Sequence, residues 1–175
     1  MAAKLKQLQA ILAKFDVIFK WLTVFSLGGM TLLITIQVIL RNLVNAPLAW
    51  SEEVARYLFI WMTFLAGYLG ARKNKHIGVA ALQNALPPLG GRILRFISYF
   101  LCAMFFSIIV YATFQFWPRL MKQTSPALEM PIAVVYFGMV LGSFFMALWY
   151  LLLAISSLSR EKDIPTTRPE EVENL

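Results

Sequence analysis

Residues 21–40 decide the fold, and they read WLTVFSLGGMTLLITIQVIL. This stretch carries no charged side chain, and about 20 apolar residues in a helix suffice to cross the hydrocarbon core of a bilayer. The apolar region of a removable signal peptide is shorter, at roughly 7–15 residues, and ends at a small-residue cleavage site. No such site follows this stretch. We therefore expect a transmembrane helix that is retained in the protein.

Three further stretches are candidates for membrane crossing. Residues 96–117 and 130–159 carry no charge, and each is long enough to span. Residues 57–71 are uncharged but short, and they reach membrane length if their helix begins near Ser51. Ser51 is expected to be the N-cap, because the carboxylates that follow it suit the N–H end of a helix. The predicted spans are about 20–41, 51–71, 93–117 and 130–158.

The composition fits a membrane protein and excludes most enzyme classes. Of 175 residues, 59% are hydrophobic and 14% are charged, whereas about 25% are charged in a soluble domain. Cys102 and His76 are the only residues of their types, which excludes intrachain disulfides and sites built from paired cysteine or histidine ligands. No ionisable residue lies well inside a predicted span, where such groups commonly mark ion paths. We expect an all-α integral membrane protein that is not an enzyme and has no catalytic, substrate-binding or metal site and no cofactor.

A single membrane domain is predicted for residues 1–164. Residues 165–175 are expected to form a disordered tail, because they are rich in proline and acidic residues. Small residues recur within the spans at a spacing that lets membrane helices approach closely. The pairs are Ala66 with Gly70, Gly67 with Ala71, and Gly138 with Gly142.

The net charge of +7 is distributed unevenly along the chain. With four spans both termini lie on one side, and that side collects 12 basic residues against four on the other. The positive-inside rule then places both termini in the cytoplasm. The basic charge indicates orientation and contact with phospholipid rather than binding of nucleic acid. Residues expected at lipid headgroups are Lys4, Lys6, Lys14, Lys20, Arg72, Lys73 and Lys75.

Residues 3–19 form an amphipathic pattern ahead of the first span. One arc of a helical wheel is apolar and the other is mostly polar, with Lys4 as the exception. A helix of this kind lies in the headgroup plane of a membrane, and we favour such an interfacial helix. The alternative is a cytoplasmic extension of the first span. The apolar arc consists of Leu5, Leu8, Ile11, Leu12, Phe15, Ile18 and Phe19.

The outer loop between the first two spans ends in a cluster of charges. Arg56 follows Glu52 by four residues and Glu53 by three, so all three can meet near one helix face. Arg41 closes the first span at the same depth, and Trp50 is expected to anchor the interface. We interpret the two carboxylates as partners that neutralise Arg56 and Arg41, because an unpaired charge at the membrane edge is costly.

His76 lies in the loop between the second and third spans, directly after Arg72-Lys73-Asn74-Lys75. It has two interpretations, as a proton carrier or ligand and as part of a structural segment. Neighbouring positive charge opposes its protonation, and no partner ligand is evident. We therefore assign His76 to structure.

Two blocks of this sequence resemble one family of transporter subunits. The first reads PLAWSEEVARYLFIW at 47–61 and continues through FLAG at 64–67 to RKNKHI at 72–77. The second reads SPALEMP at 125–131 and is followed by Tyr136. Together they resemble the small membrane subunit of the tripartite ATP-independent periplasmic (TRAP) transporters. Ala80 departs from the pattern, since many members have a polar residue near this position.

The resemblance implies a function that composition alone does not reveal. Family members lie in the bacterial inner membrane beside a large subunit that holds the substrate and sodium sites. A soluble periplasmic binding protein delivers organic acids such as sialic acid or dicarboxylates, and the small subunit enlarges the scaffold for an elevator-like movement of the large one. Structural or assembly roles then fall to Arg41, Trp50, Glu52, Glu53, Arg56 and His76, and the candidates for docking the binding protein are Asn45, Arg119, Lys122 and Glu129.

Two other classes of membrane protein remain as alternatives. One is the membrane anchor of an oxidoreductase complex, although a haem held by two histidines needs a second histidine. The other is a free-standing small multidrug exporter with four helices. Such exporters normally need a carboxylate within the membrane, and the acidic residues of this chain all lie outside the interior of the spans.

Overall fold

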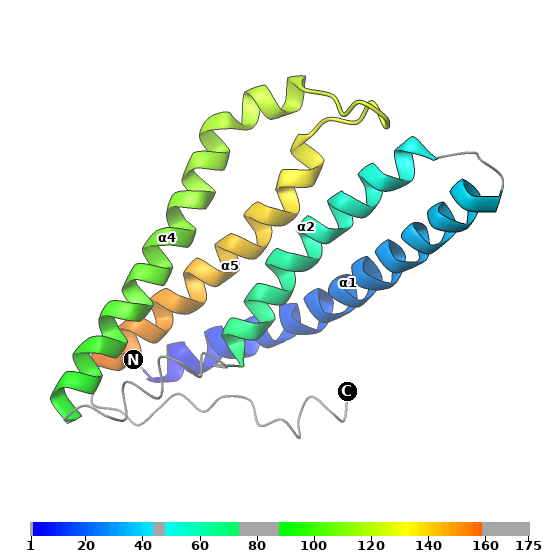
Figure 1. Cartoon of the computed structure of the whole chain (residues 1–175). Helices are drawn as coiled ribbons and strands as arrows, with labels where there is room; N and C mark the ends of the chain where they lie inside the picture. The colour runs from blue at the N-terminus through cyan, green and yellow to red at the C-terminus, as the bar shows by residue number, and fades with distance from the viewer. Residues whose placement is uncertain (1, 44–47, 74–87, 159–175) are drawn as a thin grey trace. The chain divides into compact units, whose positions relative to one another are not determined.

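The computed structural model describes residues 2–43, 48–73 and 88–158, and these residues are almost entirely helical (Figure 1). Within the described ranges there is no strand, and the one extended pairing is an isolated bridge between Thr124 and Pro131. The four helices of these described ranges are all long and apolar enough to cross a membrane. The prediction of an all-α protein with four spans is therefore confirmed. The helices are α1 (Ala2–Leu43), α2 (Ala49–Arg72), α4 (Pro88–Lys122) and α5 (Ala133–Leu158).

The helix α1 differs from the expected pair of an interfacial helix and a span. It is one unbroken helix of 42 residues. Its sequence has no glycine or proline before Gly28 that would end a helix. Leu12 and Phe19 are buried, and the Phe19 ring meets Tyr68 of α2 edge-on with centroids 5.4 Å apart. The N-terminal segment is helical as predicted, but it continues the span directly, which is the alternative arrangement.

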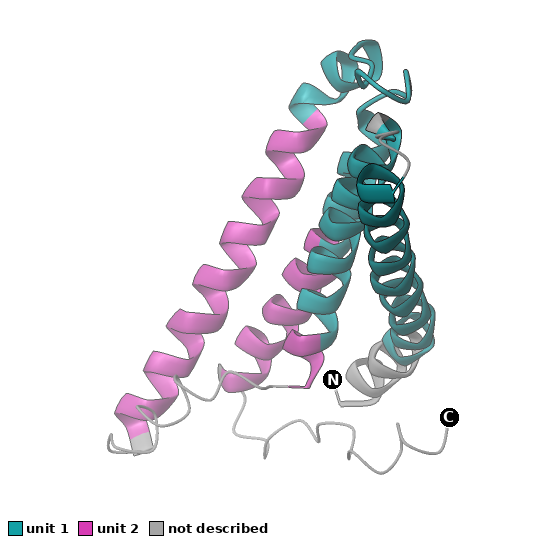
Figure 2. Ribbon diagram, turned by 45° about the vertical axis from the view of Figure 1, so that its right-hand side comes forward, with its two compact units in different colours: residues 1–69, 115–142 teal, residues 70–114, 143–175 magenta. Residues whose placement is uncertain are grey.

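The contacts divide the chain into two compact units (Figure 2). The first comprises residues 1–69 and 115–142, and the second comprises residues 70–114 and 143–175. The boundaries of the units fall inside α2, α4 and α5, so these helices contribute to both units. Each unit has its own set of packing contacts.

Close approach of α2 and α5 in the first unit depends on two glycines. A Cβ atom at Gly138 would lie 2.5 Å from ring atoms of Trp61. A Cβ atom at Gly142 would lie 2.7 Å from the backbone carbonyl of Phe64. The prediction that this pair permits close helix packing is confirmed. Gly70, which belongs to another predicted pair, has no atom within 4 Å of the corresponding position.

Aromatic rings and helix ends hold the second unit together. Tyr150 of α5 stacks on Phe106 of α4 with ring centroids 6.0 Å apart. The Trp149 indole N–H donates to the carbonyl of Ala71 at 3.1 Å, and Arg92 Nε donates to the carbonyl of Ser157 at 3.1 Å. Both carbonyls belong to the last turn of a helix, where no backbone donor is available. Side chains from other helices thus satisfy the ends of α2 and α5.

Candidate functional site

The head of α2 begins two residues earlier than expected. The helix starts at Ala49, so Ser51 lies within its first turn rather than at the N-cap. The Ser51 hydroxyl donates to the carbonyl of Leu48 at 2.8 Å. The side chain is almost completely buried. The two carboxylates that follow still lie at the start of the helix, where its dipole favours negative charge.

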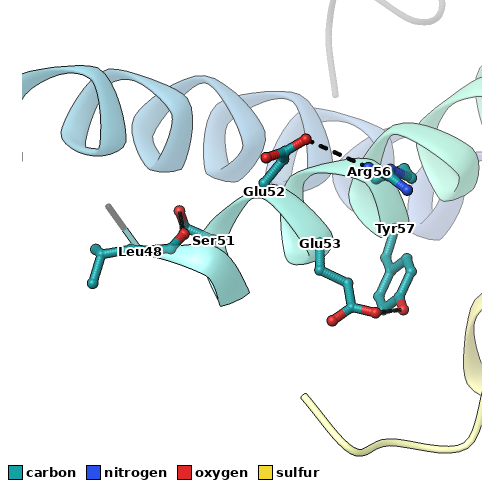
Figure 3. Close-up of polar contacts among 6 residues, drawn as sticks. All are labelled: Leu48, Ser51, Glu52, Glu53, Arg56 and Tyr57. Atoms are coloured by element: carbon teal, nitrogen blue, oxygen red, sulfur yellow. Dashed lines mark hydrogen bonds and ion pairs between the residues drawn. The ribbon is translucent and has the colours of Figure 1, made fainter. Parts of the chain in front are cut away.

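Glu53 connects the head of α2 to the loop between α4 and α5. Its Oε2 atom accepts the backbone N–H groups of Ala127 at 2.9 Å and of Leu128 at 3.1 Å. Its Oε1 atom accepts the hydroxyl of Tyr57, one turn further along α2 (Figure 3). Hydrogen bonds to an ionised acceptor are roughly twice as strong as neutral ones. One carboxylate therefore joins two segments that are 74 and 75 residues apart in the sequence.

The loop that Glu53 binds is ordered by its own backbone. Ser125 N–H donates to the carbonyl of Met130 at 2.9 Å, and Ile132 N–H donates to the carbonyl of Gln123 at 2.9 Å. Glu129 N–H donates to the carbonyl of Ser125 at 3.1 Å, which closes the tip. The loop from residue 123 to 132 is thus a compact element rather than an open connection.

Glu129 has the left-handed backbone conformation that this tip requires, with φ at 54°. A non-glycine residue in that region costs of order 1 kcal/mol, and a β-branched residue costs more. We expect Glu129→Val to lower the free energy of unfolding by about 1–2 kcal/mol. We expect Glu129→Gly to leave it within about 0.5 kcal/mol of the original, because relief of strain offsets the larger unfolded-state entropy. Chemical unfolding in detergent, followed by tryptophan fluorescence, measures both, and equal effects of the two variants would contradict the prediction.

Glu52 and Arg56 form a separate ion pair on another side of α2 (Figure 3). The pair is 3.5 Å long, and the two side chains are 68% and 67% exposed. Exposed pairs of this kind contribute little to stability. The expectation that both carboxylates neutralise Arg56 and Arg41 is thus met only by Glu52. Arg41 is exposed at the end of α1, and none of the described carboxylates lies within ion-pair distance of it.

The other predicted outer-side residues lie apart from the Glu53 contacts. Arg119 and Lys122 are exposed in the last turn of α4, and the Arg119 guanidinium lies 5.8 Å from the centre of the Phe116 ring. Glu129 is exposed at the loop tip, and Trp50 is exposed at the start of α2. Asn45 lies outside the described residues. The structure therefore brings Glu53 to the loop and leaves Arg119, Lys122, Glu129 and Trp50 on the surface.

The residues predicted at lipid headgroups have different environments. Lys14, Lys20 and Lys73 are exposed. Arg72 is only 7% exposed, and its guanidinium lies 4.2 Å from the centre of the Trp149 ring. This position differs from the exposed headgroup contact that we expected, because the indole ring offers a cation–π partner within the protein. Lys75 and His76 lie outside the described residues, as do the side chains of Lys4 and Lys6.

The sequence did not reveal most of the partners of Glu53. Tyr57 was identifiable in principle, because it lies four residues after Glu53 on a helix. The backbone donors of Ala127 and Leu128 have no sequence signature. Ser125 is buried beside the Glu53 and Tyr57 side chains, although a lone serine in a loop gives no signal.

The geometry of these contacts is suited to support rather than to chemistry. The described residues include no group of three or more histidine, cysteine or acidic side chains that could hold a metal ion. An open hollow of about 240 Å³ in the first unit is lined by Trp61, Trp117, Met121, Ala133, Val134 and Phe137. An open hollow of about 440 Å³ in the second unit is lined by Ser107, Tyr111 and apolar residues of α4 and α5.

Comparison with known proteins identifies the family. The family model described as "Tripartite ATP-independent periplasmic transporters, DctQ component" matches residues 30–160. A TRAP transporter small permease protein of Haemophilus influenzae is 30% identical over 132 residues, which are 75% of this chain and 82% of that protein. The ectoine TRAP transporter small permease protein TeaB of Halomonas elongata is 33% identical, over 70% of this chain and 65% of its own length.

Two other relatives match this chain over smaller shares of their own length. The C4-dicarboxylate small permease protein DctQ of Vibrio cholerae is 29% identical over 58% of this chain, and the match covers 44% of that protein. The sialic acid TRAP transporter permease protein SiaT of H. influenzae is 37% identical over 35% of this chain, and the match covers 11% of that protein. The matched family consists of transporter subunits and not of enzymes, and the four described helices have membrane length. This multi-pass inner-membrane protein therefore belongs to the DctQ family, which comprises the small permease subunits of TRAP transporters.

Proposed function

We propose that this chain is the fixed, non-transporting subunit of a sodium-coupled importer of organic acids. The absence of ionisable residues from the interior of the spans carries this proposal, because ion and substrate paths through a membrane commonly use such groups. The sodium and substrate sites then belong to a large permease subunit. This chain contributes no cofactor, and it enlarges the scaffold against which the large subunit moves.

The proposed partner is supported by relatives in which the homologous segment is part of a longer chain. The matches to SiaT and to the isethionate TRAP transporter permease protein DctMQ cover 11% and 15% of those proteins. In those two relatives the matching segment belongs to a longer permease protein, which supports assembly of this chain with a large permease subunit. Relatives are named for dicarboxylates, sialic acid and ectoine, and we propose an organic acid of the first two types.

Purification from native membranes tests this assignment. A large multispanning permease is expected to co-purify with the chain, and a soluble binding protein is expected to join them when its ligand is present. Transport by this chain alone in liposomes would instead favour the exporter alternative. A haem absorption spectrum of the purified chain would favour the oxidoreductase anchor.

We further propose that both termini are cytoplasmic and that the outer side docks the binding protein. The loop between α4 and α5 supports this role, because it is compact and has two exposed cations at its α4 end. Long-range attraction between charges speeds the encounter of two proteins. The docking residues are then Asn45, Arg119, Lys122 and Glu129.

The charges of Arg119 and Lys122 provide the test of docking. We expect Arg119→Glu with Lys122→Glu to lower the uptake rate severalfold when the binding protein is limiting, because rim charges act mainly on the association rate. The matched control is Arg119→Lys with Lys122→Arg, which changes both side chains and keeps both positive charges at these exposed positions. Unchanged uptake by the Arg119 and Lys122 variant at normal membrane levels would overturn the docking role.

A further inference from the structure

The charged residues proposed for docking are held in place in two different ways. Arg119 and Lys122 belong to the last turn of α4, so the helix itself fixes their backbone. Glu129 belongs to the loop between α4 and α5, outside any helix. Its position therefore depends on the contacts of residues 125–130, which we call the loop tip.

Hydrogen bonds within the loop fix the shape of the loop tip. The backbone of Ser125 pairs with that of Met130, and the backbone of Ile132 pairs with that of Gln123. Glu129 keeps a left-handed backbone with φ at 54°, a conformation that persists when the surrounding structure over-determines it. All these hydrogen bonds join residues of the loop to one another, so they do not fix the direction in which the loop tip points.

Glu53 supplies the contact from outside the loop. Its Oε2 atom accepts the N–H groups of Ala127 at 2.9 Å and of Leu128 at 3.1 Å. Its Oε1 atom accepts the hydroxyl of Tyr57, so both carboxylate oxygens are held (Figure 3). Within the described part of the chain, the bonds to Ala127 and Leu128 are the hydrogen bonds that join the loop tip to another helix.

The helix that carries Glu53 is a firm point of attachment. In the first unit, α2 packs closely on α5, where Gly138 faces the Trp61 ring and Gly142 faces the backbone of Phe64. Close-packed contacts of this kind resist displacement. The carboxylate thus fixes the loop tip to a helix whose own position is determined by packing.

We infer that Glu53 is a positioning residue for the docking of the binding protein. It holds the loop tip so that Glu129 has a fixed position relative to Arg119 and Lys122. Without this contact, the binding protein must order the loop tip when it docks, and the cost of ordering lowers the affinity of the encounter. The inference rests on the proposed function, because it concerns the docking surface assigned there.

Uptake by the reconstituted complex tests this role when the concentration of the binding protein is varied. We expect Glu53→Ala to raise the concentration that gives half the maximal rate by about tenfold. The maximal rate per complex should be unchanged, because saturating binding protein compensates for weaker association. Glu53→Gln keeps one acceptor oxygen, so it is expected to raise the half-saturating concentration less.

Two further variants make the comparison specific. Glu52→Ala removes the neighbouring carboxylate, which pairs with Arg56 and is exposed, and it should leave the half-saturating concentration unchanged. Glu53→Leu keeps a bulky side chain but offers no acceptor. It is expected to match Glu53→Ala, and it replaces that variant if the smaller side chain yields too little complex.

The outcomes separate this inference from the proposed function. An unchanged half-saturating concentration in the Glu53→Ala and Glu53→Leu complexes overturns the positioning role. A fall in the maximal rate alone, or failure of every Glu53 variant to assemble, also overturns it, because a residue needed only for folding gives those results. Uptake by the unmodified complex that needs no binding protein would overturn the proposed function itself.

Discussion

Gly142→Ala is expected to lower the free energy of unfolding by about 1–3 kcal/mol, although it adds a single methyl group. The new Cβ atom would lie 2.7 Å from the carbonyl carbon and oxygen of Phe64 and from its Cβ atom. These atoms belong to the backbone of α2 or are fixed to it, so no rotation of a side chain relieves the overlap. The two helices must move apart, and contacts along the α2–α5 interface weaken together.

Gly70→Ala provides the matched control for this prediction. Nothing lies within 4 Å of the Cβ position at Gly70, which also lies within a helix. Alanine is favoured over glycine in a helix by about 1 kcal/mol, so this variant should be neutral or stabilising. Unfolding in a mixed-micelle denaturant titration measures both variants. Equal midpoints would show that α2 and α5 do not approach as closely as the structure indicates.

The overlap that Gly138→Ala creates involves a side chain, so a second substitution can relieve it. Its Cβ atom would meet the ring of Trp61 rather than backbone atoms. A smaller side chain at residue 61 removes that overlap, at the cost of a cavity. The effects of substitutions at residues 138 and 61 on the free energy of unfolding are therefore expected to be non-additive. At Gly142 the overlap is with atoms of the Phe64 backbone and its Cβ, so truncating a side chain would not remove it.

The sequence was informative wherever a property depended on residues close together in the chain. The four spans follow from long uncharged runs, and the Gly138 and Gly142 pair follows from a spacing of four residues. The residues at which the helices end were harder to predict from the sequence. The helix α4 extends to Lys122 although Pro118 lies inside it, and our predicted span ended before that proline. A proline ends a helix only where its missing N–H and its ring are not accommodated.

Interactions between distant segments were not predictable in the same way. Arg72 was expected at lipid headgroups because it begins a basic loop, but Trp149 of α5 covers it. The amphipathic pattern of residues 3–19 is compatible with a headgroup surface and with packing against another helix. Leu12 and Phe19 from its apolar arc are buried in the structure, and a helical wheel does not distinguish these two environments.

Glu53 illustrates this limit most clearly, because two of its three partners are backbone groups of a distant loop. Glu53→Ala leaves the N–H groups of Ala127 and Leu128 and the hydroxyl of Tyr57 without their acceptor. We expect the melting temperature of the purified chain to fall by about 5 °C, because charge-assisted hydrogen bonds are lost and part-buried donors are left unpaired. Glu53→Gln keeps one acceptor oxygen and is expected to have a smaller effect.

Glu52→Ala separates this loss from a general effect of acidic charge at the head of α2. Glu52 is adjacent in sequence, but its ion-pair partner among the described residues is Arg56, and this pair is exposed, so its removal should change the melting temperature little. In the assembled transporter, Glu53→Ala is expected to reduce recovery of the complex while the substrate affinity of the complex that remains is unchanged, because the carboxylate attaches the loop between α4 and α5 to the head of α2. Equal effects of the Glu52 and Glu53 variants, or an intact complex with altered affinity, would show that Glu53 acts through its charge and not through the two backbone donors that it binds.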